Sequence, residues 1–132
     1  TNGNIWFAAT GFAHSINLAS TGRGPVIATW NDDLSSYYYG GVFVQHKTDP
    51  ERVVIEWQTE TYSEEGGYAP NDLEAVLYPN GNMRLNYKPF SGSRVKDFGS
   101  GISQGAPKKG APFFVCSRSG IAPAMVKPNL LK

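Results

Sequence analysis

Residues 73–87 read LEAVLYPNGNMRLNY, and this stretch decides the fold class that the sequence predicts. Apolar and polar residues alternate on both sides of a Pro-Asn-Gly turn, which is the pattern of two half-buried strands in a hairpin. A two-residue turn at Asn80 and Gly81 would bring Leu77 opposite Arg84 and separate the two apolar rows. A three-residue loop that ends with Gly81 in the left-handed conformation keeps both rows on one face. The pairs it predicts are Leu77 with Met83, Ala75 with Leu85 and Leu73 with Tyr87, and the polar face then carries Glu74, Arg84, Asn86 and Lys88.

The composition agrees with one small all-β domain. A chain of 132 residues can build one domain with a real core, and it is too short for two ordinary ones. Its 15 glycines, 9 prolines and charged fraction of 17% indicate many turns, and no segment has helical periodicity. We therefore expect an antiparallel β-sandwich, jelly-roll-like, of roughly seven to nine strands.

Further strands are predicted along the chain from alternation and from aromatic and β-branched content. A second hairpin joins residues 37–45 to residues 52–61 through a turn at 47–50. The sandwich domain is expected to span residues 1–105, followed by a Pro-rich arm or linker at 106–132 with one more strand at 112–116. The remaining predicted strands are residues 4–9, 12–18, 26–30 and 98–103.

Charge and cysteine content exclude several classes of function. The formal net charge of +1 gives no reason to expect nucleic acid or an anionic membrane as partner. No segment approaches the ~20 apolar residues of a membrane span, and any targeting segment is expected to have been removed or to lie upstream. With one cysteine, Cys116, the chain can form no internal disulfide or CxxC metal site. Cys116 is predicted to be a buried hydrophobe, with a reactive thiol as the alternative.

Asp32 and Asp33 are the candidate metal ligands. Adjacent carboxylates in a loop can supply oxygen ligands to calcium. The spacing of an EF-hand is absent, however, and either carboxylate could instead cap the turn through a backbone hydrogen bond. No cofactor is predicted, and calcium remains open.

Trp6, Tyr37 and Tyr39 are the candidate ligand-binding residues. Aromatic rings can stack on the apolar faces of sugars, and Tyr37 and Tyr39 would share one side of a strand. Packing within the sheet is the alternative for both tyrosines. Trp6 alternates with Ile5 and Phe7, so it faces away from them, toward solvent or toward a partner strand.

No arrangement of residues indicates catalysis. Glu56 and Glu60 lie on one strand face, about 13 Å apart by strand rise, which is too far for a glycosidase pair and indicates a hydrated face. His14 and His46 are isolated from any zinc pattern, and no nucleophile motif is present. The sequence therefore predicts that the chain is not an enzyme.

Five short motifs resemble those of nidogen-like β-sandwich modules. They are WNDDL at 30–34, YYY at 37–39, RVVIEW at 52–57, LYPNGNMRLNY at 77–87 and FGSGIS at 98–103, and the resemblance covers about residues 2–105. It implies a module of large secreted or surface-attached bacterial and archaeal proteins, with no shared catalytic residues. In that family further strands precede the segment that resembles residues 2–7. Either the chain starts inside the domain, or another chain supplies the strands, or the domain is a shortened version.

The function expected from these features is structural or adhesive. We expect a non-catalytic module of an extracellular or cell-surface protein whose partners are other protein chains or neighbouring domains. Assembly would use strand exchange, in which the N-terminal strand or residues 113–116 join a sheet of another chain. A carbohydrate-binding module that uses Trp6, Tyr37 or Tyr39 is the alternative, with glycan as partner. A fragment of a secreted enzyme ranks below both.

Overall fold

Every regular element that the structure describes is a β-strand, and all strand pairs are antiparallel. The computed structural model describes residues 2–8, 24–38, 40–62, 70–88 and 99–103, together with the backbone of residues 114–116 and 124–126. The expected all-β class is thus confirmed for this part of the chain. The strands are β1 (Asn4–Trp6), β2 (Val26–Asn31), β3 (Leu34–Ser35), β4 (Gly41–Thr48), β5 (Glu51–Thr61), β6 (Pro70–Leu77), β7 (Met83–Tyr87), β8 (Gly99–Ser103), β9 (Phe114–Cys116) and β10 (Ala124–Val126).

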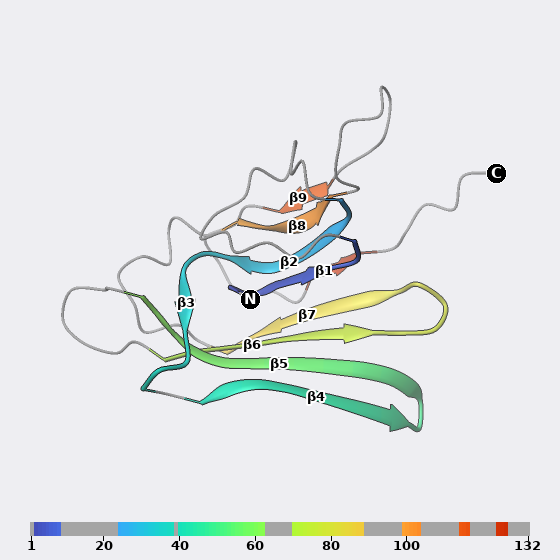
Figure 1. The fold of residues 1–132 in the computed structure, drawn as a ribbon. Helices are drawn as coiled ribbons and strands as arrows, with labels where there is room; N and C mark the ends of the chain where they lie inside the picture. Colours follow the sequence, from blue (N-terminus) through green and yellow to red (C-terminus); the bar gives the residue numbers. More distant parts are fainter. Residues whose placement is uncertain are drawn as a thin grey trace.

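The strands form two sheets (Figure 1). The small sheet has four strands in the order β1-β2-β8-β9. The large sheet has six, in the order β10-β7-β6-β5-β3, and β4 also pairs with β5. β5 is 11 residues long and pairs with two strands along the same edge. Its residues Glu51–Gln58 pair with β4, and Glu60 and Thr61 pair with β3.

The β6–β7 hairpin has the predicted register. Leu77 pairs with Met83, Ala75 with Leu85 and Leu73 with Tyr87. Gly81 has φ 80°, the left-handed conformation that the bulged turn requires. The Tyr78 N–H donates to the Asn82 carbonyl at 3.0 Å and closes the loop.

The hydrophobic core contains residues of both sheets. The two largest fully buried side chains are Trp30 of the small sheet and Trp57 of the large one. Tyr87 connects the sheets directly, since its hydroxyl donates to the Thr29 carbonyl at 2.8 Å and lies 2.6 Å from Ser100 Oγ. The core cluster consists of Ile27, Trp30, Trp57, Leu73, Ala75 and Leu85. We call the core-bearing side of the large sheet its inner face and the opposite side its outer face.

The prediction of a strand over residues 37–45 is wrong at its start. β4 begins at Gly41, and Tyr37 and Tyr38 lie in a bend between β3 and β4. The reason is Gly40, which has φ +68° and approaches the Gln58 backbone so closely that a Cβ would overlap the Gln58 carbonyl oxygen. Aromatic residues favour strands, but this backbone conformation ends the extended run.

Two further strands come from the C-terminal part of the chain. β9 lies within the range expected to form a strand and pairs with β8, whereas β10 was not predicted and pairs with β7. The Cys116 side chain and the predicted strand at 12–18 lie outside the described residues.

The outer face of the large sheet is less hydrated than expected. Glu60 is only 2% exposed, and Val54 and Val76, which pair with each other on this face, are also buried. Glu60 is covered because its carboxylate turns toward the bend after β3 and accepts the Tyr38 N–H at 3.1 Å. The expectation of a hydrated face therefore fails at Glu60.

Candidate binding surface

Asp32 stabilises the turn after β2. Its Oδ1 accepts the Asp33 N–H at 2.8 Å, and its Oδ2 accepts the Trp30 Nε1–H at 3.4 Å. The Asp33 carbonyl accepts the Tyr62 N–H at 2.8 Å, which ties this turn to the end of β5. These bonds correspond to the capping alternative for Asp32. Within the described ranges, no group of three or more His, Cys, Asp and Glu side chains lies close enough to hold a metal ion.

The structure places Trp6 in β1 and Tyr37 in the bend between β3 and β4. Tyr37 is 81% exposed and packs edge-on against Tyr38, with ring centroids 4.5 Å apart. Trp6 is half-buried and packs on Val26 and Ala28 of the small sheet. Tyr39 lies outside the described residues.

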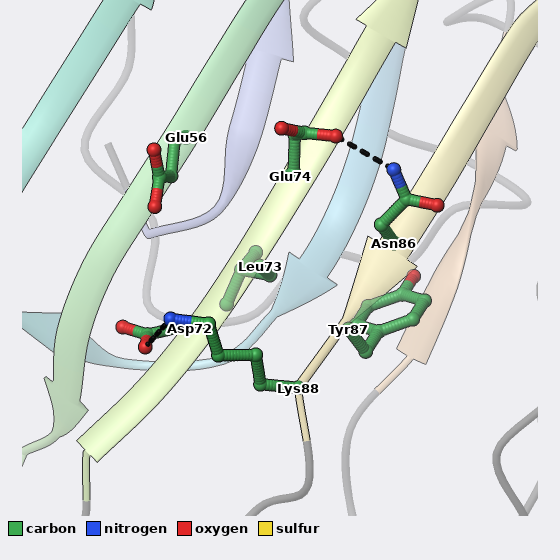
Figure 2. A pocket seen from close by; sticks show the side chains of 7 residues that line it. All are labelled: Glu56, Asp72, Leu73, Glu74, Asn86, Tyr87 and Lys88. Carbon is green, nitrogen blue, oxygen red and sulfur yellow. Dashed lines mark hydrogen bonds and ion pairs between the residues drawn. The ribbon is translucent and has the colours of Figure 1, made fainter.

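A shallow polar pocket lies on the outer face of the large sheet (Figure 2). Its volume of about 170 Å³ is below the roughly 300–1,000 Å³ of pockets that enclose drug-sized ligands. The pocket is open to solvent and crosses three adjacent strands, β5, β6 and β7. It is lined by Glu56, Asp72, Leu73, Glu74, Asn86, Tyr87 and Lys88.

Strand register places the polar groups of this pocket in two rows. Glu56 of β5 pairs with Glu74 of β6, and Glu74 pairs with Asn86 of β7. The Asn86 Nδ2–H donates to Glu74 Oε1 at 2.6 Å, as Figure 2 shows. In the adjacent row, Lys88 Nζ lies 2.7 Å from Asp72 Oδ2.

Two carboxylates therefore lie directly opposite each other on neighbouring strands. Like charges in this arrangement destabilise a sheet by a few tenths of a kcal/mol up to about 1 kcal/mol. Glu56 is held by the Gln58 Nε2–H, which donates to its Oε1 at 3.0 Å, and Glu74 is held by Asn86. Lys88 is engaged with Asp72, so its ammonium does not neutralise the pair. The site is thus locally acidic and preorganised by amide donors.

An exposed aromatic ring borders the pocket in β4. Phe43 pairs with Glu56 and shares its face of the sheet. Phe43 is 45% exposed, and its ring lies over Gly41, since a Cβ built on that glycine would lie 3.6 Å from the ring tip. Phe43, Glu56, Glu74 and Asn86 consequently form one continuous row across four strands.

β4 is also an exposed sheet edge. Among the described strands it pairs with β5 alone, through eight consecutive residue pairs without a bulge. Figure 1 shows it at the rim of the molecule. Val42, Phe43 and Val44 are 48%, 45% and 66% exposed, and β4 contributes no residue to the core cluster.

The sequence alone did not single out this surface. It did place Glu74, Asn86 and Lys88 on one face, but the pairing of β5 with β6 that adds Glu56 depends on a register that no short turn fixes. Phe43 was included in a predicted strand without a role. The sequence feature that could have indicated a role for Phe43 is the run Val42-Phe43-Val44 beside two glycines. Such a run puts apolar side chains on both faces of an edge strand.

Comparison with models of protein families, with curated sequences and with solved structures finds no significant match for this chain. Within its described part, the chain also has no helix that is long and apolar enough to cross a membrane.

Proposed function

We propose that this chain is a non-catalytic β-sandwich module of an extracellular or cell-surface protein, and that it acts in assembly or adhesion by strand addition at β4. The sandwich architecture is supported by the shared core and by the Tyr87 bond between the sheets. The location is supported by the resemblance of its motifs to nidogen-like modules. The single observation that carries the assembly role is the exposed edge of β4.

Natural proteins protect sheet edges with short strands, prolines, bulges or charges. β4 has few of these devices, because it is eight residues long, lacks proline and bulges, and carries its one lysine at Lys47 near the hairpin turn. The described edges of the small sheet, β1 and β9, have three residues each and offer fewer backbone hydrogen bonds. β4 is therefore the better site for the strand exchange expected from the sequence.

The partner that fits this edge is a second copy of the same chain. The sequence Val42-Phe43-Val44 is symmetric, so an antiparallel pairing centred on Phe43 sets Val42 of each copy opposite Val44 of the other. His46 then lies opposite Gly40, and no like charges oppose each other within residues 40–46. Apolar side chains meet on both faces, and the two large sheets become one.

The test measures the molar mass of the full chain in solution by light scattering at increasing protein concentration. We expect a dimer for the wild type and a monomer for Val44→Lys, because a lysine on this edge must be buried against the second copy. Tyr62→Lys is the matched control, since Tyr62 is also an exposed hydrophobic residue, at 60%, but lies beyond the end of β5. Thermal unfolding of both variants establishes that they remain folded.

Cysteine cross-linking tests the register. In a Cys116→Ser background, which removes the chain's one cysteine, Phe43→Cys should form a disulfide-linked dimer, because paired Cα atoms lie about 4.5–5.5 Å apart. His46→Cys should not, since its two copies are displaced by six residues, about 20 Å. A wild-type monomer at all concentrations, or a dimer that Val44→Lys leaves intact, would refute the proposal.

A further inference from the structure

The outer face of the large sheet combines three features that a sugar-binding surface needs. It has an exposed aromatic ring, a row of fixed hydrogen-bonding side chains beside it, and a shallow opening to solvent. The features belong to different strands and are brought together by the register from β4 to β7.

The aromatic ring supplies the apolar contact. Sugar rings expose C–H groups on one face, and aromatic side chains in binding sites pack flat against such surfaces. Phe43 is available because Gly41, two residues before it on the same face, has no side chain to cover the ring. Phenylalanine has no polar side-chain atom, so the exposure of the Phe43 ring is not explained by a hydrogen bond that the ring makes.

The carboxylates supply the polar contacts. An ionised carboxylate offers about four acceptor positions, and the hydrogen bonds that hold Glu56 and Glu74 each engage one of them. Hydroxyl groups of a sugar donate to such oxygens with the strength of charge-assisted bonds. A ligand hydroxyl between Glu56 and Glu74 would also relieve part of the repulsion between them.

We propose that this surface binds a glycan without acidic groups, with one sugar ring stacked on Phe43 and its hydroxyls donating to Glu56 and Glu74. The charge of the pocket sets this preference. Its lining has three carboxylates and one ammonium, and the ammonium of Lys88 is paired with Asp72. A glycan with carboxylate or sulfate groups would be repelled there.

The test is direct binding of the full chain to soluble oligosaccharides by calorimetry. The probes are cello-oligosaccharides and fully N-acetylated chitin oligosaccharides as uncharged glycans, and oligogalacturonides as the acidic glycan. We expect binding to a non-acidic probe and none to the acidic one. Phe43→Ala and Glu74→Gln should each weaken that binding by about tenfold or more, as loss of a stacking contact or a charged hydrogen bond does.

Two variants serve as controls. Tyr62→Ala removes an exposed aromatic ring outside this surface, and Glu51→Gln removes an exposed carboxylate at the β4–β5 turn, so neither should change the dissociation constant. Val44→Lys separates this proposal from the assembly role, because Val44 pairs with Ile55 and lies on the inner-face side of β4. That variant should keep its glycan affinity as a monomer. Failure to bind any non-acidic probe, preference for oligogalacturonides, or binding that survives both Phe43→Ala and Glu74→Gln would overturn the inference.

Discussion

Tyr87→Phe tests the physical link between the two sheets. The substitution removes only the hydroxyl that donates to the Thr29 carbonyl at 2.8 Å and contacts Ser100 Oγ at 2.6 Å. The Thr29 carbonyl is not left unsatisfied, because Ser100 Oγ also donates to it, at 3.0 Å. The expected loss is therefore that of a hydrogen bond whose acceptor keeps a partner, about 1 kcal/mol in the free energy of unfolding. For a chain of this size, that corresponds to a decrease of about 4 °C in Tm.

Urea unfolding followed by tryptophan fluorescence measures this effect, because Trp30 and Trp57 are both buried in the core. The slope of the free energy against urea should not change, since the hydroxyl contributes little to the surface exposed on unfolding. A double-mutant cycle with Ser100→Ala should give a coupling energy of at least about 0.5 kcal/mol. Tyr62→Phe removes a hydroxyl from an exposed residue and should change stability by less than about 0.5 kcal/mol. Equal stability of Tyr87→Phe and the wild type would refute the role of this bond.

Two more substitutions test the backbone and the core. Gly40→Ala should destabilise the fold by about 2 kcal/mol or more, since Gly40 has φ +68° and a Cβ would overlap the Gln58 carbonyl oxygen. The neighbouring Gly41→Ala meets only ordinary contact with Phe43 and should cost less than about 1 kcal/mol; equal effects in urea unfolding would contradict the explanation. Leu73→Ala should lower the free energy of unfolding by about 2–5 kcal/mol, because Leu73 is 2% exposed. Val44→Ala should change it by less than about 0.5 kcal/mol, because Val44 is 66% exposed. Similar losses for the two variants would place β4 in the core.

The part of the fold that sequence could predict is the part with local signals. In the β6–β7 hairpin the apolar alternation and the Pro-Asn-Gly turn act on the same few residues, so a register wrong by one would bury Arg84 and expose Leu85. A turn at residues 47–50 likewise predicted that the strands now seen as β4 and β5 pair, although β4 continues to Thr48. In both hairpins the residues that decide the pairing lie next to the strands they join.

The missed features depend on partners far along the chain. Tyr87 and Thr29 are 58 residues apart, and nothing beside either residue indicates that a hydroxyl will cross the core between them. Glu60 was expected in water because its own strand alternates, but the backbone of Tyr38, 22 residues earlier, covers it. The outer-face pocket has the same origin, since Glu56 and Glu74 meet only through pairing of β5 with β6. The alternation of apolar and polar residues predicts which face of a sheet a residue lies on. Which side chains lie beside it depends on the register between strands that are distant in the sequence.

The two proposed roles of β4 make separate use of its two faces. Strand addition depends on the backbone edge and on Val42 and Val44, which pair with Trp57 and Ile55 on the inner-face side and are exposed. Glycan binding depends on the outer face, where Phe43 continues the row of Glu56 and Glu74. Phe43 lies in both surfaces, because it is also the centre of the proposed twofold pairing. If a Phe43 variant lost both dimerisation and glycan binding, the result would not show which role had failed. Val44→Lys and Glu74→Gln each change one face only, so they test the two roles separately.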